Sequence, residues 1–351
     1  MLLRHYGDTD FITGLRAIAA LMVVAVHTRA FDGFGPIGET ASDNGKYGVQ
    51  IFFVISGYTI AATYLKAGRF GPYFIRRLMR IAPLYYIAVL VFFGLIASGA
   101  MVAPYFMQLY GSEADAYNLL MHLSFLSAWD ARIANSLIGV EWTIPVEIFW
   151  YAALPFLLAW RSTPRSFAMM FFGLLILSGL TRAAGELWLP KHAAHFMPTT
   201  YGAYFFLGAW CHHMRAQMTD TPGFAAHRWL LAGYVVFALA LLTKTGMSAA
   251  LMAVATALII VSYRVRPDGV QLLRSRPFML VGSISYSIYL WHLLVVYLCV
   301  RIMGGTYAAL PDLAKFLLVS GATIALSVVT YRLIERPTNA LGRRLSDRMT
   351  V

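Results

Sequence analysis

The amino-acid sequence predicts an all-α integral membrane protein with about ten transmembrane helices and both termini in the cytoplasm. Composition is the first observation: 59% of the 351 residues are hydrophobic and only 13% are charged, unlike an ordinary soluble domain. The second observation is a series of apolar runs of about 20 residues, the length that crosses a bilayer as a helix. The third is an uneven distribution of Lys and Arg among the loops.

Ten apolar runs are candidates for these helices, and they are residues 11–29, 47–65, 79–99, 139–160, 166–183, 198–214, 228–243, 246–263, 279–301 and 315–333. The first run contains an Arg and a His and lacks a small-residue cleavage site, so we expect it to remain as a signal-anchor helix. Residues 117–129 are apolar but too short to span a bilayer. We interpret them as an amphipathic or re-entrant segment on the outer face, because an eleventh helix would invert every later loop.

The Lys and Arg residues indicate the orientation of the ten helices, because cytoplasmic loops hold the excess. With the N-terminus inside, 20 of the 28 basic residues fall on the cytoplasmic side. The outer side receives the other eight, which are Arg29, Lys46, Arg132, Arg182, Lys191, Lys244, Arg301 and Lys315. The distribution therefore agrees with ten helices and two cytoplasmic termini.

The sequence contains no linker rich in Pro, Gly or Ser that would separate a second domain. We therefore interpret residues 1–336 as one membrane domain and residues 337–351 as a short basic cytoplasmic tail. The net charge of +12 does not indicate nucleic-acid binding, since the charges occur in short clusters between apolar runs. The lipid bilayer is the first partner that the sequence predicts.

The first expected helix carries two ionisable residues, Arg16 and His27, in the stretch GLRAIAALMVVAVHTRAF. They are eleven residues apart, which puts them on nearly the same helix face and about 16 Å from each other. Intramembrane ionisable groups usually face the protein interior and mark function. The structural alternative is that Arg16 reaches the cytoplasmic headgroups and His27 is a hydrogen-bonded residue near the outer end. The shared face favours the functional interpretation.

The stretch FIRRLMRIAPLYY carries a cluster of arginines. Arg77 and Arg80 are three residues apart and therefore neighbours on one helix face, and Arg76 adds a third cation. Guanidinium groups bind phosphate oxygens in bidentate geometry, so the cluster is a candidate phosphate site. The alternative, which the spacing alone favours, is a topogenic cluster in contact with anionic lipid.

The stretch EWTIPVEIFWYAALP holds two carboxylates in one expected helix. We expect Glu141 near the outer interface, Glu147 about 9 Å further in, and a kink at Pro145. A carboxylate in hydrocarbon needs a partner or a proton, so Glu147 is a candidate partner of His27 or of a substrate hydroxyl. A structural ion pair with an Arg is the alternative, and it is favoured for Glu141. Glu141 and Trp142 are also candidate substrate contacts.

Two further stretches give weaker candidates for substrate contact. Ser56 and Tyr58 lie in GVQIFFVISGYTI, where the small residues Ser56 and Gly57 are also typical of close helix packing. His292 lies in SISYSIYLWHLLVV, and a lone histidine on a helix is more often a packed residue with satisfied hydrogen bonds. No set of residues indicates a metal site.

Taken in order along the chain, these stretches resemble acyltransferase family 3, the membrane-bound acyltransferases that modify bacterial surface glycans. The matching stretches are GLRAIAALMVVAVH, GVQIFFVISGY, RRLMRIAPLYY, WTIPVEIFWY, YFFLGA, ISYSIYLWH and IERP, which cover most of the chain. By this resemblance, the family's essential pair matches Arg16 and His27, its basic motif matches Arg77 and Arg80, and its Ser-x-Glu glutamate matches Glu147.

The resemblance implies a surface-polysaccharide O-acetyltransferase of the bacterial inner membrane. Such an enzyme takes an acyl group, most often acetyl, from cytoplasmic acyl-CoA and delivers it to a hydroxyl of an extracytoplasmic or lipid-linked glycan, without a metal. The sequence departs from the family at Pro145, which replaces the motif's Ser, and at Thr13, where many members have Asp. It also lacks the extracytoplasmic hydrolase-like domain of some members, so a second transfer step would need a separate extracytoplasmic protein.

The helix geometry and the resemblance lead to one expected mechanism. The arginines at positions 16, 77 and 80 would hold the phosphates of acetyl-CoA at the cytoplasmic mouth, with His27 about 16 Å from Arg16. His27 would act as a general base on the acceptor hydroxyl or as a transient acyl carrier, and Glu147 would orient its imidazole. The alternative function is a multi-helix transporter or flippase with a buried Arg, His and Glu pathway. Such transporters consist of related halves, and the sequence shows none.

Overall fold

The computed structural model describes residues 9–159, 163–217, 224–263 and 271–349, and every regular element in these ranges is helical. Six helical stretches are long and apolar enough to cross a membrane: Asp10–Thr28, Asp32–Ala67, Phe70–Ala97, Arg165–Trp188, Ser285–Met303 and Asp312–Arg348. Three shorter apolar helices cover Thr143–Ala159, His227–Leu242 and Ser248–Ser262. The predicted all-α membrane class is therefore confirmed, and the number of ten spans stays a prediction.

The chain divides into two compact units, each built from two separated segments. Unit 1 consists of Met1–Ile55 and Trp210–Val329, and unit 2 consists of Ser56–Ala209 and Thr330–Val351. Three helices, α3 (Gly48–Ala67), α10 (Gly202–Gln217) and the end of α16 (Asp312–Thr330), continue from one unit into the other along the chain.

Helix α1 (Asp10–Thr28) is the centre of unit 1 and packs against α13 (Arg276–Ser283) and α14 (Ser285–Met303). Its most buried residues are apolar. The negative charge of Asp10, in the first turn, stabilises the helix by its interaction with the positive end of the helix dipole. A side chain at Gly282 would overlap the backbone carbonyl of Thr13. Glycine is thus required where α13 crosses α1, because the two backbones are in contact.

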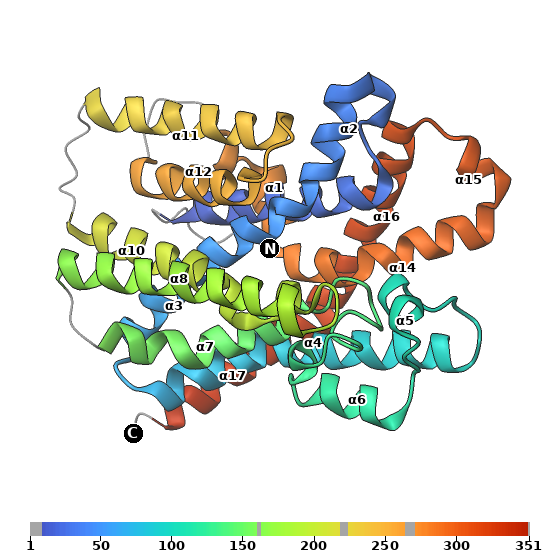
Figure 1. Cartoon of the computed structure of the whole chain (residues 1–351), viewed down its shortest axis with the longest axis horizontal. Coiled ribbons are helices and arrows are strands. Elements are labelled where there is room, and N and C mark those ends of the chain that lie inside the picture. The colour runs from blue at the N-terminus through green and yellow to red at the C-terminus, as the bar shows by residue number, and fades with distance from the viewer. Residues whose placement is uncertain (1–8, 160–162, 218–223, 264–270, 350–351) are drawn as a thin grey trace. The chain divides into compact units, whose positions relative to one another are not determined.

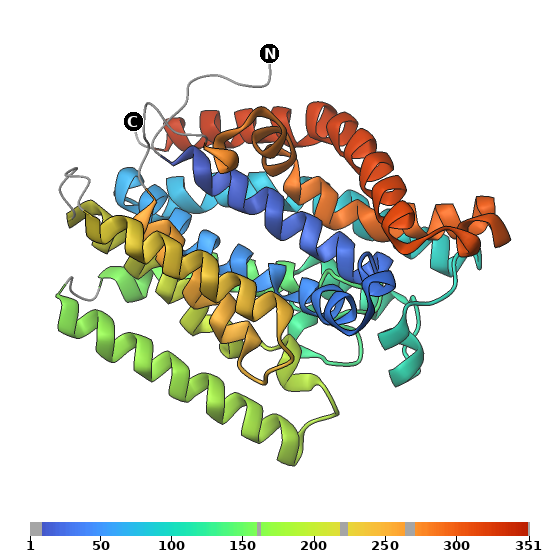
Figure 2. The same cartoon turned by 90° about the horizontal axis from the view of Figure 1, so that it is seen from above.

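The rest of unit 1 surrounds this centre. Helices α11 (Phe224–Leu242) and α12 (Ser248–Ser262) run side by side as a hairpin (Figures 1 and 2). The amide of Asn44, at the end of α2 (Gly35–Asn44), donates to the last carbonyl oxygens of α11 and so caps that helix. Helices α15 (Gly305–Ala309) and α16 (Asp312–Thr330) complete the unit.

Helix α4 (Phe70–Ala97) is the longest element of unit 2 and packs against α7 (Thr143–Ala159) and α17 (Arg336–Arg348). A π-helical turn, Tyr331–Glu335, leads into α17. Arg76 of α4 donates to Ser346 at 2.7 Å and to Asp347 at 2.6 Å. The expected tail at residues 337–351 is therefore a packed helix as far as Arg348, and its cytoplasmic location stays a prediction.

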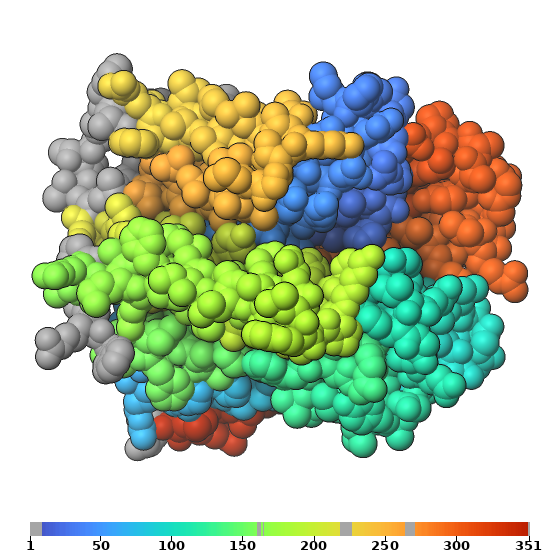
Figure 3. Space-filling view, in the orientation of Figure 1, coloured from blue at the N-terminus to red at the C-terminus, as the bar shows by residue number. Residues whose placement is uncertain are grey.

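Helix α8 (Pro164–Trp188) lies on the surface of unit 2 (Figure 3). Its first turn is closed by a capping box between Thr163 and Ser166. The helix exposes large apolar side chains along its length: Met169, Phe172, Leu175, Ile176, Leu177, Leu180, Leu187 and Trp188. A long exposed apolar surface is unfavourable in water and favourable against lipid tails, so this helix agrees with a membrane location.

Short helices connect these long ones in unit 2: α5 (Tyr105–Tyr110), α6 (Ala116–Leu123), α9 (Ala193–Phe196) and the 3-10 turns Ser127–Trp129 and Pro198–Tyr201. Residues 117–129 thus form a short helix and a turn, as expected of a segment that does not span. The expected kink at Pro145 is wrong, because α7 begins at Thr143. Pro145 lies in the first turn, where a backbone N–H would have no carbonyl partner within the helix, so the proline does not distort it.

Part of the charge pattern falls outside the described residues, namely Arg4, Arg161, Arg264 and Arg266. The remaining expected helix, at 198–214, corresponds to the turn Pro198–Tyr201 followed by α10. Helix α10 is only 16 residues long and carries His212, His213 and Arg215.

Candidate active site

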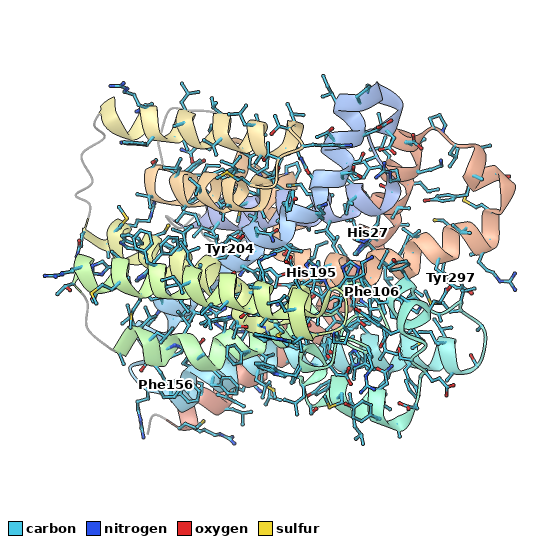
Figure 4. The ribbon with its side chains drawn as sticks, viewed as in Figure 1. His27, Phe106, Phe156, His195, Tyr204 and Tyr297 are labelled. Carbon is cyan, nitrogen blue, oxygen red and sulfur yellow. The ribbon has the colours of Figure 1, made fainter. Side chains whose placement is uncertain are left out.

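Two histidines from distant parts of the sequence meet in unit 1. The Nε2 atom of His292 on α14 lies 3.1 Å from the Nδ1 atom of His27 on α1, and the ring centroids are 4.9 Å apart. His292 is completely buried, whereas His27, which is labelled in Figure 4, is an exposed residue of unit 1. His292 therefore supports the imidazole of His27 from behind, and His27 presents the accessible ring.

Hydrogen-bond partners fix the proton positions in the neutral form of this pair. The Nδ1 atom of His292 lies 2.9 Å from the carbonyl oxygen of Tyr289 and 3.2 Å from that of Ile288. A carbonyl oxygen only accepts, so Nδ1 of His292 carries the proton and its Nε2 is an acceptor. Nδ1 of His27 faces two acceptors, the Val23 carbonyl oxygen at 2.8 Å and Nε2 of His292. It is therefore protonated, and the lone pair of His27 lies on Nε2.

Arg16 lies on the same continuous helix as His27. The eleven residues between the two positions correspond to about three turns and about 16 Å along the axis. Arg16 is half-buried within unit 1. The predicted placement of these two residues on one uninterrupted helix is confirmed.

A second polar cluster lies inside unit 2, where Ser56 of α3 donates a hydrogen bond to the carboxylate of Glu147 on α7. The guanidinium of Arg77 on α4 lies 5.1 Å from the ring centre of Tyr151 and donates to Thr63 at 2.9 Å. Within the described residues, Glu147 forms no ion pair with an arginine, which was the structural alternative for this residue. Its hydrogen-bond donor is the hydroxyl of Ser56.

The three arginines of the basic stretch have different environments. Arg77 is only 4% exposed and also lies 6.0 Å from the ring centre of Tyr73. A side chain buried to this extent does not touch lipid headgroups, so the lipid-contact alternative does not apply to Arg77. Arg76 points to α17, as described above, and Arg80 is half-buried. Arg77 and Arg80 were expected to be neighbours on one helix face. Of the two, Arg77 is in the protein interior and Arg80 is partly accessible.

Arg77→Ala is expected to destabilise the protein by about 2 kcal/mol or more, because it removes two cation–π contacts and the donor to Thr63. Thermal unfolding of the purified protein without ligand measures this effect. Arg69→Ala is the control, since this exposed arginine of the same region loses one hydrogen bond to the Met349 carbonyl oxygen, worth about 1 kcal/mol. An equal loss of stability in both variants would contradict the interior role of Arg77.

The remaining predicted residues lie in the interior of unit 2. Glu141 is completely buried, accepts the backbone N–H of Leu137 at 2.7 Å and of Gly139 at 2.6 Å, and lies 3.5 Å from His122. These contacts are with backbone N–H groups and a histidine, where the sequence favoured an arginine, and they hold the turn that precedes α7. The location of Glu141 near the outer interface stays a prediction. The other two candidates, Tyr58 and Trp142, are 5% and 8% exposed.

Several neighbours in the structure were not predicted from the sequence. The partner of His27 in unit 1 is His292, where the sequence suggested Glu147. The residues that surround Arg77, namely Thr63, Tyr73 and Tyr151, were not predicted, although Tyr73 is four residues before Arg77 and Tyr151 is four residues after Glu147. This spacing places each pair on one helix face and was the available signal. His122, the neighbour of Glu141, was also missed.

Among the described residues, no three His, Cys, Asp or Glu side chains form a group that could hold a metal ion. A neutral imidazole with its lone pair on Nε2, as in His27, is chemically able to accept a proton from a hydroxyl group. In unit 2, the carboxylate of Glu147 and the buried guanidinium of Arg77 are the corresponding charged groups. Each unit thus offers polar groups suited to acid–base chemistry or to charge stabilisation in an apolar surrounding.

Comparisons with known proteins point to one class of enzyme. A family model described as an acyltransferase domain matches residues 9–332. The chain is 25% identical to nodulation protein 10 of Rhizobium leguminosarum bv. viciae over 85% of each chain. It is 22% identical to a peptidoglycan O-acetyltransferase of Listeria monocytogenes and 24% identical to a putative peptidoglycan O-acetyltransferase of Bacillus subtilis. These matches cover 94% and 98% of this chain, but only 56% and 57% of the two relatives. No solved structure matches.

Proposed function

This chain belongs to acyltransferase family 3, and from that premise we propose that it moves an acyl group from cytoplasmic acyl-CoA to a hydroxyl of a glycan. The proposed donor is acetyl-CoA, and the proposed acceptor is an extracytoplasmic or lipid-linked sugar. The acceptor class is supported by the names of two relatives, which are peptidoglycan O-acetyltransferases. The proposed location is the bacterial cytoplasmic membrane, which agrees with the six long apolar helices.

One observation carries this proposal: the accessible imidazole of His27 has its proton on Nδ1 and its lone pair on Nε2. A neutral imidazole in this state is a general base. In the proposed step, Nε2 takes the proton of the acceptor hydroxyl while the hydroxyl oxygen attacks the thioester carbonyl. The C–S bond then breaks, and the leaving thiolate receives the proton from His27.

The proposed donor contacts are the arginines at positions 16, 77 and 80. Arg16 and Arg80 are half-buried and suit contact with phosphate groups at the mouth of a site. Arg77 is buried near the rings of Tyr73 and Tyr151, so it could contact only a part of the donor that enters the interior of unit 2. We keep Glu147 as a proposed catalytic residue, with its carboxylate oriented by Ser56.

Binding of CoA tests the donor assignment. The purified protein in detergent is expected to show a higher unfolding temperature with CoA, because a ligand at a hundredfold excess over its Kd stabilises by about 2.7 kcal/mol. Arg16→Ala is expected to lose this stabilisation. Arg182→Ala, an exposed arginine on α8, is the control and is expected to keep it.

If CoA stabilises neither the parent protein nor the control variant, the acyl-CoA proposal is wrong and the transporter or flippase alternative gains support. Glycan mass spectrometry of a deletion strain and its parent then tests the acceptor. A loss of acyl ester on a glycan in the deletion strain identifies both the acyl group and the acceptor. Unchanged glycans would argue against a glycan as acceptor.

A further inference from the structure

The last helical segment of unit 2, residues 331–348, carries a group of exposed arginines. It consists of the π-helical turn Tyr331–Glu335 and helix α17. Five arginines of this segment are exposed: Arg332, Arg336, Arg343, Arg344 and Arg348. Among the residues that the structure describes, none of these five forms an ion pair or a side-chain hydrogen bond. They are cations at the surface without a partner in the described protein.

The acidic residues of the same segment do not neutralise these arginines. Only two are present, and Glu335 is 4% exposed. The other, Asp347, forms its ion pair with Arg76 of α4 at 2.6 Å. Arg344 and Arg348 are four positions apart on α17, and like charges at this spacing destabilise a helix. An anionic partner from outside the chain would remove this repulsion.

Contacts with α4 place α17 beside the N-terminal half of that helix (Figure 1). Gly342 lies against Met79, and Arg69 donates to the Met349 carbonyl oxygen at 3.1 Å. Large apolar side chains are exposed further along α4: Ile87, Leu90 and Val91. Leu90 is eleven residues after Met79, or about 16 Å along the helix axis. A basic end beside an apolar, exposed stretch is expected where a helix passes from the headgroups of a bilayer into its hydrocarbon.

We propose that the five exposed arginines of residues 331–348 form a binding surface for the headgroups of anionic phospholipids. Arg336 and Arg348, at the two ends of α17, are about 18 Å apart along the helix axis. Such an extended row of cations suits several headgroups in a membrane surface better than one small ligand. The exposed side chains of Leu333 and Leu341 lie between the arginines in the sequence and suit partial insertion beside the headgroups.

The charge pattern supports the cytoplasmic leaflet as the surface that is bound. The positive-inside rule assigns these arginines to the cytoplasmic side, and the cytoplasmic leaflet carries the negative surface potential of its anionic lipids. Guanidinium groups also match phosphate oxygens in geometry. The proposal does not depend on the proposed acyltransferase function, because none of the five arginines is a proposed contact of the donor.

Lipid binding by the purified full-length protein in an uncharged detergent tests this proposal. Phosphatidylglycerol or phosphatidylcholine is added, and native mass spectrometry measures the bound lipid. The parent protein is expected to bind phosphatidylglycerol in preference to phosphatidylcholine. Arg343→Gln combined with Arg344→Gln is expected to weaken phosphatidylglycerol binding about 25-fold, because each arginine near an anionic surface contributes about fivefold. Binding of phosphatidylcholine is expected to be unchanged.

Two further double variants serve as controls. Arg182→Gln with Arg301→Gln removes the same charge from two exposed arginines, on α8 and α14, and is expected to keep the lipid preference of the parent. Arg343→Lys with Arg344→Lys retains both charges on α17. It is expected to keep most of the preference, because attraction to an anionic surface depends on charge.

Thermal stabilisation by CoA distinguishes lipid phosphate from the phosphates of the donor. The glutamine variant of α17 is expected to show the same CoA effect as the parent. The proposal is overturned if the parent binds both lipids equally, if the glutamine variant keeps the preference for phosphatidylglycerol, or if the control on α8 and α14 loses it to the same extent. Loss of the CoA effect with unchanged lipid binding would assign these arginines to the donor instead.

Discussion

Purified His27→Gln protein is expected to transfer acyl groups from acetyl-CoA about 10²- to 10⁴-fold more slowly than the parent, the range for loss of a general base. The glutamine side chain fills similar space but has no nitrogen that takes up a proton at neutral pH. The rate is measured as release of the CoA thiol in the presence of the acceptor. Thermal stabilisation by CoA is expected to remain, since the proposed phosphate contacts are arginines.

His213→Ala is the control for this experiment, because His213 is also in unit 1, lies 2.9 Å from the side-chain amide of Gln217 on the same helix, and has no role in the proposed transfer. It is expected to keep the parent rate. His292→Phe should reduce the rate by about tenfold, less than His27→Gln, because the Val23 carbonyl still holds Nδ1 of His27. A His27→Gln enzyme with the parent rate would exclude His27 as the base.

Reaction of the unmodified enzyme in the absence of acceptor distinguishes direct attack from an acyl-enzyme relay. In direct attack the acyl carbon passes from the thioester to the acceptor oxygen in one step, with His27 holding only a proton. In a relay, Nε2 of His27 itself becomes acylated first. Brief reaction with acetyl-CoA without acceptor, followed by peptide mass spectrometry, is expected to show no acyl group on His27 in the direct mechanism. An adduct at His27 that disappears on addition of acceptor would establish the relay.

Features that depend on one helix were predictable from the sequence. Arg16 and His27 lie on one uninterrupted α1, and the periodicity of the helix alone gave their shared face. The all-helical class followed equally from the long apolar runs, because a lipid-exposed backbone must satisfy its own hydrogen bonds. The small residue Gly57 in the middle of α3 indicated close helix packing, and it does contact the backbone of Phe205.

Features that join distant parts of the chain were not predictable in the same way. His27 and His292 are separated by 265 positions, and no periodicity relates two different helices. The burial of Arg77 depends on Tyr73 and Tyr151, so an arginine cluster that resembles a surface patch places one member in the interior. Pro145 was expected to kink a helix because the sequence pattern did not show that α7 begins only two residues earlier.

Gly57→Ala is expected to destabilise the protein by about 3 kcal/mol or more, because the added methyl group would overlap the backbone carbonyl of Phe205. A backbone atom on a helix does not move aside as a flexible side chain does, so α3 and α10 must separate. Ser56, the residue before Gly57, would then shift relative to Glu147. Because Ser56 orients the carboxylate of Glu147, activity should fall together with stability. Thermal unfolding in detergent measures the change. Gly173→Ala in α8 is the control, since nothing lies within 4 Å of its added methyl group. Equal unfolding temperatures for the two variants would show that α3 and α10 do not need this close contact.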